Sequence, residues 1–146
     1  MNVDLKFESK EVERRLREIS MQLPGNVKKA LNVTAMYSEN YLLNRTEEGR
    51  GYRGAFAPYS LGYAKFRKKK GRQTTRVDFN FSGRMLASIS HTTKKEEASI
   101  RFNRASEAKK AAMLNIKRPW FGFNESEQKR IRKFFYRSFL TKAVVK

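Results

Sequence analysis

The sequence predicts an α+β protein in which N-terminal helices and a C-terminal helix cover a small antiparallel β-sheet. Two patterns indicate this fold class: apolar residues recur at helical spacing near both ends of the chain, and they alternate with polar residues in its middle. Composition adds a third observation, because 39% hydrophobic and 12% aromatic residues in a chain of 146 are enough for one core. No linker or internal repeat divides the sequence. We therefore expect a single domain over residues 1–146.

The N-terminal third is predicted to hold one strand and two helices. Residues 3–7 alternate between apolar and charged side chains, which is typical of an edge strand. Ser9 is placed to cap an amphipathic helix that the Pro-Gly pair at 24–25 ends. A second helix is expected over residues 26–45, with Gly49 as its stop. The apolar positions of the first helix are Val12, Leu16, Ile19 and Leu23.

The middle of the chain is predicted to pass from a loop through a short helix to strands. Three glycines and a proline within residues 49–58 indicate a structured loop, and Ser60 is placed to cap a short helix. That helix is expected to break down in the basic run that follows and to end by Gly71. Two or three antiparallel strands are expected among residues 77–81, 85–93 and 98–102, with residues 94–97 as a polar hairpin turn.

The C-terminal part is predicted to be helical. A short helix over residues 107–114 precedes a compact aromatic segment at 118–123. Asn124 or Ser126 is placed to cap a last helix that has one apolar face. This face consists of Ile131, Phe134, Phe135, Ser138 and Phe139. Residues 141–146 are expected to fray.

The net charge of +19 is unevenly distributed. Residues 1–48 are balanced, whereas residues 49–77 carry nine basic groups and no acidic group. A field of this kind attracts polyanions, chiefly nucleic acid, or an acidic protein surface. The candidate contact residues are Lys65, Arg67, Lys68, Lys69, Lys70, Arg72 and Arg76. The alternative interpretation is a mobile cationic loop whose flanking aromatic side chains belong to the core.

Residue types suited to catalysis are scarce. His91 is the single histidine and the chain has no cysteine, so the sequence offers neither a zinc set nor a nucleophile paired with a base. A structural histidine is the expected role. The glycines at 49, 51 and 54 follow a predicted helix and not a strand, which excludes a dinucleotide-binding turn. We therefore predict no catalytic, cofactor-binding or metal-binding residue and no enzymatic activity.

Three segments occur in an informative order. Residues 54–60 read Gly-Ala-Phe-Ala-Pro-Tyr-Ser, residues 81–89 read Phe-Ser-Gly-Arg-Met-Leu-Ala-Ser-Ile, and residues 118–123 read Arg-Pro-Trp-Phe-Gly-Phe. In this order they resemble the virion morphogenesis or tail-completion proteins of tailed bacteriophages (minor tail protein Z-like). The resemblance covers residues 54–139. Its structural motif residues are Pro58, Ser82, Gly83, Leu86, Arg118, Trp120, Phe121 and Gly122.

The resemblance implies a structural protein of the virion, made in the host cytoplasm and located in the head-tail neck or at the tail terminus. It implies a ring of identical subunits that contacts connector or adaptor proteins, tail-terminator or tail-tube proteins and packaged DNA, with no cofactor. No apolar run in the sequence is long enough for a membrane span, so no membrane partner is expected. The alternative function, indicated by charge alone, is a basic nucleic-acid-binding module.

Overall fold

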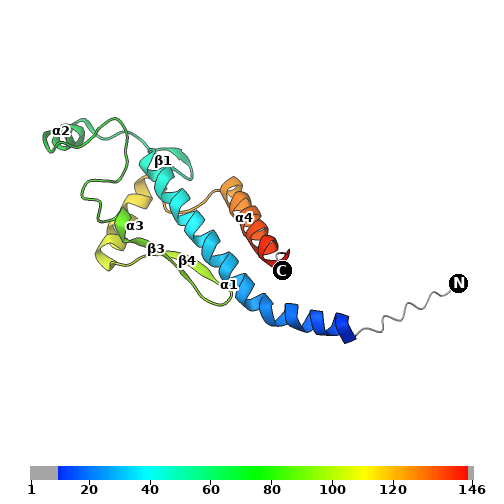
Figure 1. The fold of residues 1–146 in the computed structure, drawn as a ribbon. Coiled ribbons are helices and arrows are strands. Elements are labelled where there is room, and N and C mark those ends of the chain that lie inside the picture. The colour runs from blue at the N-terminus through cyan, green and yellow to red at the C-terminus, as the bar shows by residue number, and fades with distance from the viewer. Residues whose placement is uncertain (1–9, 145–146) are drawn as a thin grey trace.

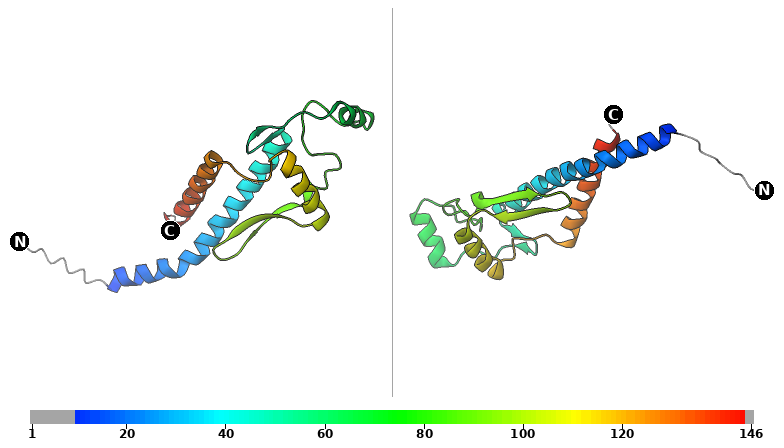
Figure 2. Two further views of the ribbon diagram at one scale, coloured as in Figure 1. Left: turned by 180° about the vertical axis from the view of Figure 1, so that it is seen from behind. Right: turned by 90° about the horizontal axis from the view of Figure 1, so that it is seen from below.

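The computed structural model of the protein describes residues 10–144, and its longest element is the 38-residue helix α1 (Lys10–Glu47). Figure 1 shows α1 between two partners, with the β3–β4 hairpin on one side and the C-terminal helix on the other. The other elements are grouped at the C-terminal end of α1 (Figures 1 and 2). The edge strand predicted for residues 3–7 lies outside the described residues.

The prediction of two N-terminal helices is wrong, because α1 continues through Pro24. A proline inside a helix removes one backbone hydrogen bond and crowds the carbonyl four residues earlier, which bends the helix but does not always end it. Here Ser20, Pro24 and Gly25 are all exposed, so water can reach the freed carbonyl. Figure 1 shows α1 bending in its first third, drawn in blue.

Two separate antiparallel hairpins supply the strands. In the first, β1 (Arg50–Gly51) pairs with β2 (Gly54–Ala55), so the predicted loop contains a minimal hairpin. In the second, β3 (Ile89–Thr93) pairs with β4 (Ala98–Phe102). The amide of Lys94 donates to the carbonyl of Glu97 at 2.7 Å, which confirms the predicted polar turn. The predicted α+β class is confirmed, with two small sheets in place of one.

The strand predicted for residues 77–81 is wrong, since this stretch is irregular. Phe79 adopts a left-handed backbone conformation (φ 53°), which a strand does not tolerate. Asp78 holds the segment through its side chain, because its Oδ1 accepts from the amide of Asn80 at 3.0 Å. The strand predicted for residues 85–93 begins only at Ile89, after a 3-10 turn over Leu86–Ser88.

Two shorter helices lie where the sequence predicts helices, but both are longer than expected. Helix α2 (Leu61–Lys69) begins at the predicted cap, where the Ser60 hydroxyl accepts from the amide of Tyr63 at 3.4 Å. It continues well into the basic run and ends before Gly71, which has a φ of 67°. Helix α3 (Ala105–Lys117) extends beyond the predicted residues 107–114 at both ends.

The last helix, α4 (Glu125–Val144), is capped by Asn124 and not by Ser126. The Asn124 side chain accepts from the amide of Glu127 at 2.9 Å, and the Glu127 carboxylate accepts from the amide of Asn124 at 2.9 Å. This reciprocal pair is a capping box, and it satisfies two amides that a helix start leaves free. The expectation of a frayed tail is wrong as far as Val144.

The buried core lies where α1, α3 and the β3–β4 hairpin meet. Trp120 is fully buried at its centre and contacts the ring of Phe102, with a centroid distance of 6.1 Å. The buried apolar residues of this cluster are Leu42, Met85, Leu86, Ile89, Ala111 and Trp120. The core therefore joins residues from five segments of the chain.

A buried ion pair fastens α4 to α1. The Arg45 guanidinium donates to both carboxylate oxygens of Glu127 at 2.8 and 2.7 Å, and also to the carbonyls of Trp120 and Gly122 at 2.6 and 2.9 Å. Tyr41 donates to the same carboxylate at 3.1 Å. One side chain of α1 thereby holds the start of α4 and the aromatic segment before it.

We expect the free energy of unfolding to decrease as the pH is lowered in the acid range, in part through Glu127. Burial acts to raise the pKa of Glu127, but the hydrogen bonds from Arg45 and Asn124 prevail and hold it below its ordinary value. The folded protein therefore binds fewer protons than the unfolded chain. The stabilisation is complete above the unfolded pKa of about 4.3 and is lost as the pH falls through the folded pKa.

Urea unfolding at several pH values between 7 and 3 checks this pH dependence. Glu127→Gln should flatten the acid slope, whereas Glu125→Gln, a change at a largely exposed neighbour, should leave it as it is. Equal slopes for the wild type and Glu127→Gln would contradict the expectation.

Gly51 lies where β1 passes close to the aromatic segment. A Cβ atom at this position would lie 1.9 Å from the carbonyl oxygen of Pro119 and 2.8 Å from the ring of Phe56. Gly51→Ala is therefore expected to lower the free energy of unfolding by about 1–3 kcal/mol through overpacking. Gly62→Ala is the control, because nothing lies within 4 Å of its Cβ position and it sits inside α2. Equal urea midpoints for the two variants would refute the clash.

Candidate functional site

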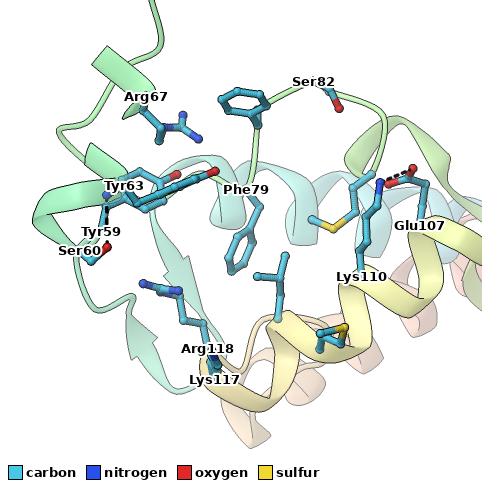
Figure 3. A pocket seen from close by; sticks show the side chains of 15 residues that line it. Tyr59, Ser60, Tyr63, Arg67, Phe79, Ser82, Glu107, Lys110, Lys117 and Arg118 are labelled. Carbon is cyan, nitrogen blue, oxygen red and sulfur yellow. Dashed lines mark hydrogen bonds and ion pairs between the residues drawn. The ribbon is translucent and has the colours of Figure 1, made fainter. Parts of the chain in front are cut away.

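A groove of about 690 Å³ opens between α2, the irregular segment before β3, and α3 (Figure 3). Phe79 projects into its middle, with Met85 and Leu114 also lining it. Tyr59 and Tyr63 form the wall on the side of α2. The groove is thus lined mainly by apolar and aromatic side chains.

Large aliphatic side chains stand exposed on both helices that border the groove. Leu61 at the start of α2 and Ile116 near the end of α3 are each 83% exposed, and Met113 on α3 is 71% exposed. Tyr63 and Phe66 on α2 are exposed as well. Water contact costs about 25 cal/mol for each Å² of apolar surface, so such a group is typical of a surface that another protein covers.

Helix α2 stands away from the rest of the molecule (Figure 1), and a buried arginine fastens it. The Arg67 side chain is 1% exposed and lies 4.6 Å from the centre of the Tyr59 ring. It donates to the Asp78 carboxylate at 3.2 Å and to the carbonyl of Gln73 at 3.0 Å. Figure 3 shows Arg67 pointing inward from α2.

Asp78 receives several hydrogen bonds besides that of Arg67. Burial acts to raise the pKa of Asp78, but donors from Gln73, Asn80 and Tyr59 together with the charge of Arg67 hold it below the ordinary value. The carboxylate therefore stays charged at neutral pH and keeps its pairing with Arg67. This pairing holds the irregular segment and α2 together.

The predicted cationic contact residues divide into two groups. Helix α2 and the irregular segment up to Asn80 form an arm, residues 61–80. Arg67 is buried and stabilises the interior of this arm, which corrects the expectation that it contacts a partner. Arg76 is exposed but donates to the carbonyl of Glu47 at 2.6 Å, and Arg72 lies 5.8 Å from the Phe81 ring. The exposed lysines of the arm are Lys65, Lys68, Lys69 and Lys70. None of these lysines has an ion-pair partner among residues 10–144.

Several motif residues that are distant in the sequence lie together. Arg118 donates to the carbonyl of Pro58 at 3.2 Å, and Leu86 shares the buried core with Trp120. The ring of Phe121 packs on Phe102 at a centroid distance of 4.9 Å. The aromatic segment thus joins the first loop to the hairpin.

The other motif residues lie at turns. Gly83 has a φ of 75°, a conformation that glycine adopts without strain, and Ser82 beside it is exposed at the edge of the groove. The carbonyl of Gly122 accepts a hydrogen bond from Arg45, and a Cβ atom at residue 122 would lie 3.1 Å from the Tyr52 ring. The motif residues therefore position the walls of the groove, and Ser82, Gly83 and Arg118 line it.

Two carboxylates pair with basic side chains, one at the groove and one on α1. Glu107 is buried, and its carboxylate accepts from Lys110 at 3.0 Å. His91 lies on β3 with Nδ1 2.6 Å from the Glu39 carboxylate, so it ties the hairpin to α1 in the structural role expected for it. Within residues 10–144 no group of three or more His, Cys, Asp or Glu side chains is placed to hold a metal ion. The lining of the groove is thus mainly apolar and aromatic.

No family model, curated protein or solved structure matches this chain. Separately, no helix in the described part of the chain combines the length and apolar character needed to cross a membrane.

The α3 side of the groove was not foreseen from the sequence. Met113 and Ile116 lie on the face of α3 that is turned away from the buried Ala111. A signal was present, since a short helix with apolar residues on both faces has more apolar surface than one core contact can cover. Buried Arg45 and Glu127 were also missed, because ionic residues carry no periodic pattern.

Arg67→Ala is expected to loosen α2 while the core stays folded. The change removes hydrogen bonds to a carboxylate and uncovers the Tyr59 ring, a loss of about 1.5–3 kcal/mol. Amide hydrogen exchange in α2 should then be about 10 to 100 times faster, as followed by mass spectrometry. Lys68→Ala, at an exposed neighbouring position, is the control. Unchanged exchange in Arg67→Ala would show that the arm is fastened elsewhere.

Proposed function

We propose that this chain is a non-enzymatic structural component of the head-tail neck or tail terminus of a tailed bacteriophage, where copies of it form a ring. The order of the three motif segments supports the family. The observation that carries the assembly role is the apolar groove with Leu61, Met113 and Ile116 exposed beside it. Contacts with connector, tail-terminator or tail-tube proteins belong to the same proposal.

A second copy of the chain is the occupant proposed for the groove. The groove lies at one end of the molecule, and the N-terminal third of α1 projects at the opposite end (Figures 1 and 2). That projecting helix leaves Met21 81% exposed and Leu23 exposed beside it. Two different surfaces at opposite ends form head-to-tail contacts, and such contacts close into a ring when the rotation between neighbours permits it.

Electrostatics give this interface a recognisable salt dependence. Each copy carries a net charge of +19, so neighbours in a ring repel one another. Salt screens repulsion between exposed charges, whereas it does not weaken contact between apolar side chains. Oligomers held by the groove should therefore persist or increase as the salt concentration rises.

Sedimentation velocity at several protein concentrations tests the assembly. Leu61→Ser with Ile116→Ser should weaken self-association about 100-fold or more, because two exposed aliphatic groups contribute about 1.5–3 kcal/mol each when a partner covers them. Both side chains are 83% exposed, so the fold should not suffer. Met36→Ser with Leu140→Ser, at exposed apolar positions outside the groove, is the matched control.

A phage that lacks this chain tests the virion role. Infected cells should accumulate separate heads and tails, and wild-type protein supplied from a plasmid should restore joined particles. The groove variant should fail to restore them, whereas the control variant should succeed. Normal joined virions without the chain, or a purified wild-type protein that stays monomeric at every concentration, would refute the proposal.

A further inference from the structure

The exposed side of α4 that borders α1 carries a stripe of cationic side chains. Arg130, Lys133 and Arg137 are spaced by three and four residues, which places them on one face of the helix. All three are exposed, and they line a shallow hollow of about 260 Å³ with Tyr37 and Phe134. At 1.5 Å of rise per residue the stripe is about 10 Å long.

These charges are not neutralised within the protein. Of the two acidic residues in the first turn of α4, Glu125 pairs with Lys129 at 3.2 Å and Glu127 is turned inward to Arg45. No ion pair among residues 10–144 includes Arg130, Lys133 or Arg137. The stripe is therefore free to bind an anionic partner.

The packing of α4 decides which polyanion fits. A basic amphipathic helix binds a membrane surface by inserting its apolar face, but here Phe134 stacks on Tyr37 of α1 with a centroid distance of 4.3 Å. The apolar face is thus occupied, and the cations are exposed. An acidic protein surface would also be attracted to these charges, and competition by polyglutamate distinguishes it from nucleic acid. A duplex, in contrast, offers about one negative charge per 1.7 Å of its axis, in regular array.

We propose that this cationic stripe of α4 binds the phosphate backbone of nucleic acid without regard to base sequence. Arg130, Lys133 and Arg137 are the contact residues, and Tyr136, which is exposed on the same helix, lies beside them. This surface is distinct from the groove and from the basic run of α2. The inference does not depend on ring formation, because a single α4 presents the whole stripe.

Fluorescence anisotropy with a labelled 20-base-pair duplex tests the proposal at 50, 100 and 200 mM KCl. The test variant carries Arg130→Gln, Lys133→Gln and Arg137→Gln, and the control carries Lys68→Gln, Lys69→Gln and Lys70→Gln. Both lose the same charge. The slope of log K against log salt is negative, and each lost phosphate contact should reduce its magnitude by about 0.9, so for the α4 variant the magnitude should fall by about 2.7. Its affinity at 100 mM should fall on the order of 100-fold, against a few-fold at most for the control.

Two further measurements keep the outcome decisive. If the triple variant is poorly folded, Lys133→Gln with Arg137→Gln takes its place, because it leaves Arg130 over the Tyr41 ring, 5.6 Å from its centre. This double variant should reduce the magnitude of the slope by about 1.8. Duplexes of unrelated sequence should bind within about twofold of each other. Equal losses in the α4 and α2 variants, no binding at 50 mM, a strong sequence preference, or equal competition by polyglutamate would each overturn the proposal.

Discussion

Arg45→Ala is expected to lower the free energy of unfolding by about 3–5 kcal/mol, because it leaves the buried Glu127 carboxylate without its counter-charge. The two side chains are 4% and 6% exposed, so water cannot replace the guanidinium without opening the structure. The change also removes the donor to the carbonyls of Trp120 and Gly122. The effect should therefore reach both the start of α4 and the aromatic segment.

Urea unfolding at pH 7 measures this loss. Arg45→Lys keeps the charge but cannot donate to both carboxylate oxygens and two carbonyls in one plane, so it should recover only part of the stability. The paired change Arg45→Met with Glu127→Leu removes both charges and should be less harmful than Arg45→Ala alone. An Arg45→Ala protein within about 1 kcal/mol of the wild type would show that the pair does not fasten α4.

Trp120→Ala is expected to cost about 3–5 kcal/mol, the range for removing a large aromatic side chain from a core. Trp120 is fully buried and has ring neighbours on three sides, with centroid distances of 5.4 Å to Phe79, 6.1 Å to Phe102 and 5.5 Å to Phe121. Its indole nitrogen donates to the carbonyl of Ala111. The cavity would therefore lie between α3, the hairpin and the floor of the groove.

Thermal and urea unfolding of Trp120→Ala check this expectation. Trp120→Phe should be intermediate, since it keeps a ring but loses volume and a donor. Tyr136→Ala is the control for losing an aromatic residue, because Tyr136 is largely exposed and the cost should stay near 0.5 kcal/mol. A Trp120→Ala protein as stable as Tyr136→Ala would place the centre of the core elsewhere.

Local chemistry explains the parts of the fold that could be predicted from sequence. The polar turn at residues 94–97 and the strand that follows it both carry strong short-range signals, as does the cap at Asn124. The break expected at residues 24–25 failed because an exposed proline bends a helix without ending it. The alternation at residues 77–81 misled because the side chain of Asp78 holds the backbone there in place of a neighbouring strand.

The candidate site was only partly predictable. The basic run was evident, but sequence alone did not show that Arg67 is buried, because this depends on Asp78 and Tyr59 meeting it in space. Arg45 and Glu127 are 82 residues apart, and nothing in the pattern of charges pairs them. The exposure of Met113 and Ile116 likewise depends on which face of α3 packs against the core, and tertiary packing decides this.

A mixing experiment is the most direct test of head-to-tail assembly. One protein carries Leu61→Ser with Ile116→Ser beside the groove, and the other carries Met21→Ser with Leu23→Ser on the projecting part of α1. Each should be monomeric alone, because each lacks one of the two complementary surfaces. Native mass spectrometry of the mixture should then show heterodimers and no larger species. The intact groove of one protein binds the intact helix of the other, and the two surfaces that the heterodimer leaves exposed are both altered. Monomers only in the mixture, or full oligomers in either protein alone, would contradict the account.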